Sequence, residues 1–169
     1  FGVFLPPQAQ AGRVPVLCGV AQSRLADAKA DVDAAAELGA DAVLRAPPEY
    51  DHNDQATVRS VYRAMAAGSP GQIRVYNIPQ NTKVVADPAT VAALAREGSV
   101  VGIKDSSRDL EYFETVCAAT RGLPDVRIFT GSDPMLPAPL ATGVPRQHWR
   151  ARARHTGRAV GDFCTVSWG

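Results

Sequence analysis

The chain has 169 residues, of which 46% are hydrophobic, so it has the length of one ordinary domain and enough apolar side chains for a substantial core. Its 18 Lys and Arg residues nearly balance 17 Asp and Glu residues, and a net charge of +1 gives no overall bias toward nucleic acid or a membrane surface. No apolar run approaches the length that crosses a bilayer, and three scattered cysteines are typical of reduced thiols in a cytoplasmic protein.

Strand-like runs and helical patterns alternate along the chain. Strands are expected to begin near Val14, Asp41, Gln72, Ser99 and Asp125. Between them, apolar side chains recur at helical spacing in residues 24–38 and 55–67, after the capping pair Asp87-Pro88, and after Asp109. Such alternation predicts a parallel α/β protein, either a barrel or a doubly wound sheet. Because the strands lack the glycine-rich turn of a dinucleotide site, the barrel is favoured.

A single lysine ends the apolar run of residues 100–104. Burial disfavours the ammonium form of a lysine and so favours a neutral amine that can attack a carbonyl carbon. On a strand, Lys104 shares a face with Gly102, and we expect this glycine to leave room beside the amine for a small ketone. The alternative is a lysine that only marks where the strand meets solvent.

A tyrosine occupies the corresponding place on the preceding strand. The run of residues 73–79 contains Tyr76, about one strand–helix–strand repeat before Lys104, so both residues are expected at the same end of neighbouring parallel strands. A phenol beside an imine-forming lysine can relay protons. The alternative for Tyr76 is a buried core tyrosine. Arg45 and Arg74 also interrupt strands suited to burial. Each arginine is expected either to pair with an acidic side chain inside the barrel or to lie exposed.

Three short motifs together carry a family resemblance: Tyr76–Pro79 (YNIP), Gly102–Asp105 (GIKD) and Gly131–Asp133 (GSD). In this order and at this spacing, they resemble the pyruvate-dependent class I aldolase and synthase family that includes dihydrodipicolinate synthase and N-acetylneuraminate lyase. The resemblance implies a (β/α)8 TIM barrel without cofactor or metal. It further implies that Lys104 forms a Schiff base with pyruvate and that Tyr76 relays protons. Gly102 and Gly131 are candidate substrate-binding residues.

The resemblance covers only part of such a barrel. Residues 11–143 correspond to about five of the eight β/α units, strands three to seven, and lack the Gly-Thr-Thr-Gly loop that holds the pyruvate carboxylate in the family. Residues 1–10 form a non-matching segment, and residues 144–169 an Arg-rich tail that we expect to be frame-shifted or disordered. The strands beginning near Val14 and Asp125 are therefore expected to be unpaired edges.

Two further residues bear on partners and substrate. Tyr50 follows a strand at the place where the resemblance implies a proton relay reaching into a neighbouring subunit, and hence a homo-oligomer; a surface loop aromatic is the alternative. Asn81 stands five positions after Tyr76, where dihydrodipicolinate synthases carry an arginine for the carboxylate of the second substrate. Asparagine cannot make that bidentate contact, so we expect a substrate other than aspartate semialdehyde.

The sequence therefore predicts a Schiff-base-forming lyase that acts on pyruvate or another 2-oxo acid and makes or breaks a carbon–carbon bond. A catalytically inactive, truncated remnant of such an enzyme is the alternative. A nucleic-acid binder working through the basic tail is a third hypothesis, which nothing else in the chain supports.

Overall fold

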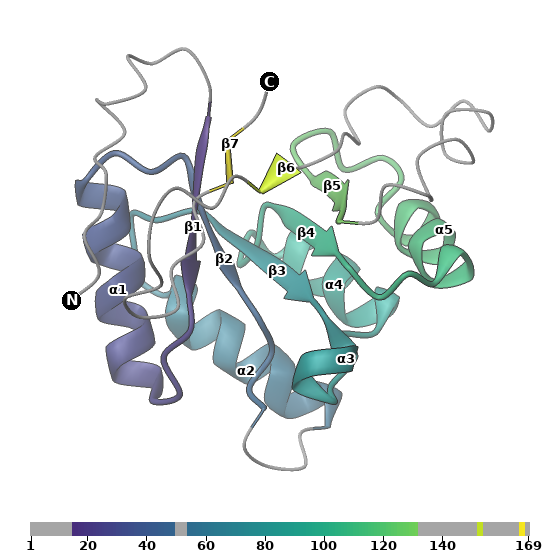
Figure 1. Ribbon diagram of the computed structural model, residues 1–169, viewed down its shortest axis with the longest axis horizontal. Helices are drawn as coiled ribbons and strands as arrows, with labels where there is room; N and C mark the ends of the chain where they lie inside the picture. The colour runs from purple at the N-terminus through teal and green to yellow at the C-terminus, as the bar shows by residue number, and fades with distance from the viewer. Residues whose placement is uncertain (1–14, 50–53, 132–151, 154–165, 168–169) are drawn as a thin grey trace.

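The computed structural model describes residues 15–49, 54–131, 152–153 and 166–167. Within them, five parallel strands alternate with helices (Figure 1). The strands are β1 (Val16–Val20), β2 (Ala42–Arg45), β3 (Ile73–Asn77), β4 (Gly102–Asp105) and β5 (Arg127–Thr130). The helices are α1 (Leu25–Glu37), α2 (Gln55–Ala66), α3 (Pro79–Thr82), α4 (Pro88–Arg96) and α5 (Leu110–Ala119). All five strands and the four longer helices agree with the predicted elements; the short α3 was not predicted.

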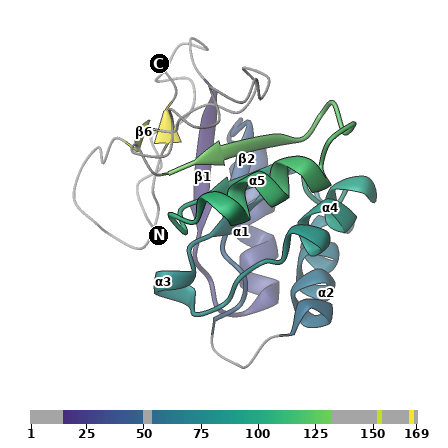
Figure 2. The ribbon, with the colours of Figure 1, turned by 90° about the vertical axis from the view of Figure 1, so that its right-hand side faces the viewer.

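The sheet has the order expected of consecutive barrel units. β5, β4, β3, β2 and β1 lie side by side, and each pair of neighbours is parallel. The four longer helices follow one face of the curved sheet, as the two ribbon views show (Figures 1 and 2). This is an α/β partial (β/α)8 barrel, and the predicted fold class is confirmed.

Alternation along the strands gives the sheet two different faces. Val75 and Ile103 point toward the helices and belong to the main core, in which the largest fully buried side chain is Tyr62 of α2. Leu17 and Leu44 point the other way and, with Ala42, form a second, smaller cluster. That opposite face corresponds to a barrel interior.

Helix starts follow local capping chemistry. The carboxylate of Asp54 accepts a hydrogen bond from Thr57 N–H at 2.7 Å where α2 begins, and Asp109 accepts one from Tyr112 N–H at 3.0 Å where α5 begins. Asp87 occupies the corresponding position before α4, but its side chain makes no capping hydrogen bond. None of the helices in the described ranges is long and apolar enough to span a membrane.

The edge of β1 differs from the prediction. Two short strands, β6 (Arg152–Ala153) and β7 (Val166–Ser167), extend the sheet, and β7 pairs with β1 in the antiparallel direction. The expectation that β1 would be an unpaired edge is therefore wrong. The physical reason is that an open edge presents free N–H and C=O groups that any extended segment of the chain can bind. Within the described residues, β5 pairs only with β4.

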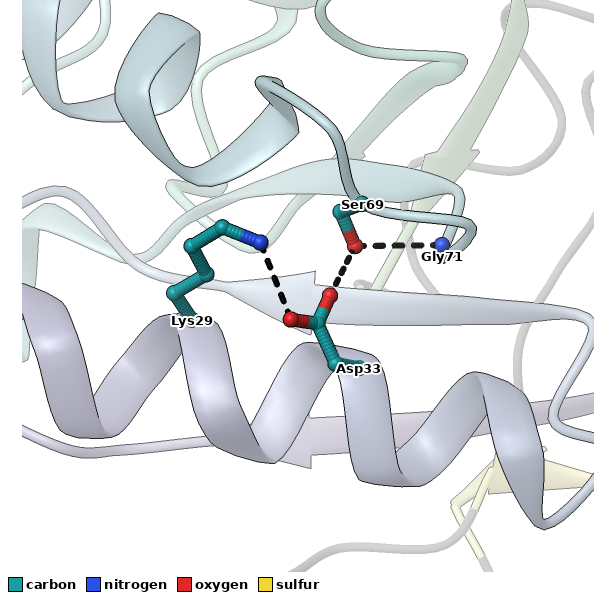
Figure 3. A network of polar contacts seen from close by, with 4 residues as sticks. All are labelled: Lys29, Asp33, Ser69 and Gly71. Atoms are coloured by element: carbon teal, nitrogen blue, oxygen red, sulfur yellow. Dashed lines mark hydrogen bonds and ion pairs between the residues drawn. The ribbon is translucent and has the colours of Figure 1, made fainter.

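A polar network ties α1 to the loop before β3 (Figure 3). The hydroxyl of Ser69 donates to the Asp33 carboxylate at 2.5 Å, and Lys29 Nζ donates to the other carboxylate oxygen at 2.9 Å. Gly71 N–H donates to Ser69 Oγ at 3.2 Å. The hydrogen bonds from Ser69 and Lys29 hold the pKa of Asp33 below its usual value. This network lies at the amino ends of the strands, where barrel proteins place stabilising rather than reactive groups.

Candidate active site

Lys104 and Tyr76 face each other across neighbouring strands. They are direct register partners in the β3–β4 pair, and Lys104 Nζ lies 4.4 Å from the centroid of the Tyr76 ring. Lys104 is only 7% exposed, and Tyr76 is half-buried against the smaller apolar cluster. Both stand toward the carboxyl ends of their strands, the end at which barrel enzymes carry their reactive groups. The structure thus brings the two predicted residues together.

The two candidate glycines lie in different surroundings. Gly131 borders Lys104: a Cβ at this position would lie 3.5 Å from Lys104 Cε and would collide with Ser106 Oγ. Gly102 has a φ of +149° and faces β5, where a Cβ would collide with the carbonyl oxygen of Arg127. The close approach of β5 therefore accounts for the glycine at position 102, whereas Gly131 is the glycine beside the amine.

Two arginines occupy buried or half-buried strand positions. Arg74 Nη1 donates to the carbonyl of Val101 at 3.1 Å, and its guanidinium lies 5.0 Å from the centroid of the Phe129 ring. Burial first, and then the charge of Arg127, lower the pKa of Arg74 to about 10. Burial also lowers the pKa of Arg45. Neither Arg45 nor Arg74 forms an ion pair within the described part of the chain.

The residues around α3 bear on substrate choice. Asn81 is exposed on α3, and its backbone N–H donates to the carbonyl of Ile78 at 3.0 Å. Lys83 ends α3 with a left-handed φ of 59°, and its Nζ donates to the carbonyl of Gln80 at 2.7 Å. The ammonium of Lys83 is therefore engaged within its own turn.

Some predicted features lie outside the described residues. These are Tyr50, Ser132 and Asp133. Among the residues that are described, no group of three or more His, Cys, Asp or Glu side chains is arranged to hold a metal ion.

Sequence reasoning did not single out two buried polar residues beside the lysine and the tyrosine. Asn77 is 0% exposed and Asp105 is 1% exposed, and the amide of Asn77 donates to the Asp105 carboxylate at 2.8 Å. Each follows a candidate residue directly in the chain, so each points to the opposite face. The signal in the sequence is a polar residue at a helix-facing position of an otherwise apolar strand.

Consecutive parallel β/α units, with an amine and a phenol side by side toward the strands' carboxyl ends, define an incomplete (β/α)8 barrel with a lysine-centred site. Comparison with known protein families identifies the family to which this barrel belongs. The chain belongs to the Dihydrodipicolinate synthetase family, whose family model matches residues 7–146.

Individual relatives agree with this assignment. A 4-hydroxy-tetrahydrodipicolinate synthase of Kosmotoga olearia is 33% identical over 123 residues, which cover 72% of this chain and 42% of that protein. The structure of dihydrodipicolinate synthase from Bacteroides thetaiotaomicron matches with a TM-score of 0.75 and 31% identity, over 85% of this chain and 47% of that one. A 2-keto 3-deoxygluconate aldolase from Picrophilus torridus matches with a TM-score of 0.67 and 30% identity, over 74% of this chain and 45% of that one. The chain thus spans less than half the length of these relatives.

Proposed function

We propose that the protein is a Schiff-base-forming lyase that acts on pyruvate or a related 2-oxo acid. The observation that carries the proposal is the position of Lys104 Nζ over the Tyr76 ring, in register on neighbouring strands. Family membership and the likeness to an aldolase structure support the same reaction type.

In the proposed reaction, Lys104 is the nucleophile. Its neutral amine attacks the ketone carbon, and a C–N bond forms as the π bond of the carbonyl breaks. The nitrogen passes one of its two protons to the carbinolamine oxygen, which takes up a second proton and leaves as water, so the protonated imine keeps one N–H. The resulting protonated imine accepts the electron pair of the carbon–carbon bond that breaks, which gives an enamine. The Tyr76 hydroxyl gives and takes the protons of the carbinolamine step, and Gly131 borders the carbon that carries the amine.

An inactive remnant is the second candidate. It is favoured by one observation: the chain covers less than half of the length of its relatives. The experiments on activity therefore use a complemented barrel, by which we mean this chain together with the remaining barrel units of a family relative. If the remnant hypothesis is correct, the 169-residue chain alone will form no adduct with a 2-oxo acid at Lys104, even though the complemented barrel does.

Enamine formation provides the test of the proposed function. An enamine takes up deuterium from the solvent at the pyruvate methyl group, and proton NMR follows the loss of the methyl signal. The complemented barrel should catalyse this exchange, Lys104→Arg should abolish it, and Tyr76→Phe should slow it by about 10²- to 10⁴-fold. Tyr62→Phe is the matched control, since its hydroxyl donates to a backbone carbonyl on the helix side of the sheet. Undiminished exchange in Lys104→Arg contradicts the proposal.

We propose that the protein does not use aspartate semialdehyde as the second substrate beside pyruvate. Its substrate is instead a sugar-derived 2-oxo acid, or pyruvate together with another aldehyde. The support is that position 81 carries an amide where an arginine would bind a second carboxylate, and that the ammonium of Lys83 is bound to Gln80. In steady-state assays of the complemented barrel, we expect Asn81→Arg to raise activity with aspartate semialdehyde, which the unchanged barrel should use poorly. Aspartate semialdehyde as the best substrate of the unchanged barrel would refute this part of the proposal.

A cytoplasmic location and a homo-oligomeric parent protein remain parts of the proposal. Cys18 and Cys117 are free thiols, and burial raises the pKa of Cys18 to about 12 and that of Cys117 to about 11. Inert, reduced cysteines of this kind are typical of proteins in a reducing compartment.

A further inference from the structure

A buried hydrogen-bonded pair joins the two strands that carry the candidate catalytic residues. Asn77 ends β3 and Asp105 ends β4, and the two are register partners one position beyond Tyr76 and Lys104. Asn77 Nδ2 donates to Asp105 Oδ1 at 2.8 Å. Since side chains alternate along a strand, the pair lies on the helix side of the sheet and the lysine and tyrosine lie on the other.

The pair is anchored to loops on both sides. Ala86 N–H, between α3 and α4, donates to Asn77 Oδ1 at 3.2 Å. Ser107, in the loop before α5, donates to Asp105 Oδ1 through its N–H at 3.2 Å and to Oδ2 through its hydroxyl at 2.9 Å. The amide and carboxylate thus hold the ends of β3 and β4 and the loops that follow each strand.

The Asp105 carboxylate depends on hydrogen bonds rather than on a cation. It forms no ion pair within the described residues, and burial raises its pKa while the bonds from Asn77 and Ser107 act in the opposite direction. A buried carboxylate held only by neutral donors requires those donors to keep fixed positions, because a lost donor leaves a buried polar group unsatisfied. Asn77 and Ser107 therefore hold the Asp105 side chain in place at the end of β4.

We infer that Asn77 and Asp105 are positioning residues that hold Lys104 and Tyr76 in contact. The inference rests on the proposed function for its catalytic meaning, but the contact itself can be measured without catalysis. Backbone hydrogen bonds join the ends of the same strands: Ser106 N–H donates to the Asn77 carbonyl at 2.8 Å, and Gly131 N–H donates to the Asp105 carbonyl at 2.7 Å. Loss of the pair frees the strand ends, and the amine then moves off the ring.

Two readouts test this inference. The first, on the full 169-residue chain, is the proton NMR shift of the Lys104 Cε protons, which the ring current of Tyr76 moves upfield when the side chain lies over the ring. The second, on the complemented barrel, is the rate at which borohydride traps pyruvate on Lys104. Asp105→Ala removes all three side-chain bonds, whereas Asp105→Asn keeps both bonds to Oδ1 and places an amide opposite Ser107. The control is Thr120→Val, which removes a buried hydrogen bond to the Val116 carbonyl within the last turn of α5.

We expect Asp105→Ala to lose the upfield shift and to trap pyruvate about 100-fold more slowly, as a displaced catalytic group does. Asp105→Asn and Thr120→Val should keep the shift and the rate. Because Asp105→Ala can fail to fold, Ser107→Ala supplies a milder change, for which a drop in rate of about threefold and a partial loss of the shift are expected.

The inference is overturned if a folded Asp105→Ala or Ser107→Ala chain keeps the wild-type shift and rate, or if Asp105→Asn loses as much as Asp105→Ala. Failure of the proposed function gives a different result. In that case no pyruvate is trapped on Lys104 of the unchanged complemented barrel, while the shift still distinguishes the variants in the expected order.

Discussion

Lys104 and Tyr76 meet because of backbone register, since no hydrogen bond joins them in the described structure. Each occupies the barrel-interior face of its strand, and the pairing of β3 with β4 sets them directly opposite each other. The residue that follows each of them points to the helices and belongs to a separate, fully buried hydrogen-bonded pair. Chemistry on one face of the sheet thus depends on polar packing on the other.

The glycines at positions 102 and 131 should respond differently to alanine. Gly102→Ala places a methyl group against the carbonyl of Arg127 at a left-handed φ, and we expect it to lower the free energy of unfolding by about 2–3 kcal/mol or more. Gly131→Ala meets the side chain of Ser106, whose hydroxyl can rotate away and whose Cβ would lie at 3.3 Å, so it should cost less stability than Gly102→Ala but crowd Lys104. Urea denaturation compares the two variants. Equal losses of stability would contradict this assignment of structural and site-bordering roles.

The buried carboxyl of Asp105 predicts a pH dependence of stability. Its pKa is raised in the folded chain, chiefly by burial. A carboxyl with a raised folded pKa contributes stability below its ordinary value of 3.8, and this contribution is lost as the pH rises through the folded value. Asp105→Asn has no such titration, so its free energy of unfolding should improve relative to wild type between about pH 4 and pH 7. Urea unfolding at both pH values measures the difference, and a constant difference would contradict the prediction.

At the scale of elements, the sequence was most informative where the pattern is local. Apolar spacing predicted α1 and α2, and apolar spacing together with an aspartate at the helix start predicted α4 and α5, because an amphipathic helix depends on its own residues. The short α3 was missed because four residues carry no periodic signal. The pairing of β7 with β1 was also missed, since it joins residues far apart in the chain that share no sequence pattern.

That pairing predicts a role for the end of the chain. Val16 and Leu17 of β1 lie opposite Ser167 and Val166, so deletion of residues 160–169 leaves the β1 edge open. Open apolar edges associate with other chains, and light scattering should show concentration-dependent association of the shortened protein. Deletion of residues 1–10 removes a similar length and serves as the control. Equal behaviour of the two deletions would show that β7 does not protect the edge.

At the scale of the whole molecule, the motifs predicted which strands meet but not what supports the site. The order and spacing of the YNIP and GIKD motifs were sufficient to place Tyr76 beside Lys104, because consecutive parallel units repeat at a regular length. The supporting Asn77–Asp105 pair was not foreseen, since it depends on burial and on loop donors that only the folded chain brings together. The structural reason for a glycine at position 102 was not foreseen either, because the carbonyl of Arg127 that excludes a side chain there comes from the next strand.

The central claim is that Lys104 is the residue that forms the imine, and covalent trapping tests it most directly. The complemented barrel is incubated with pyruvate and then with borohydride, and peptide mass mapping locates the reduced adduct. The other two lysines of the chain, Lys29 and Lys83, are internal controls, because their amines are bound to Asp33 and to the Gln80 carbonyl. We predict a pyruvate-derived mass on Lys104 alone, and none in Lys104→Arg. An adduct on Lys29 or Lys83, or no adduct in a folded barrel that binds pyruvate, would contradict the account.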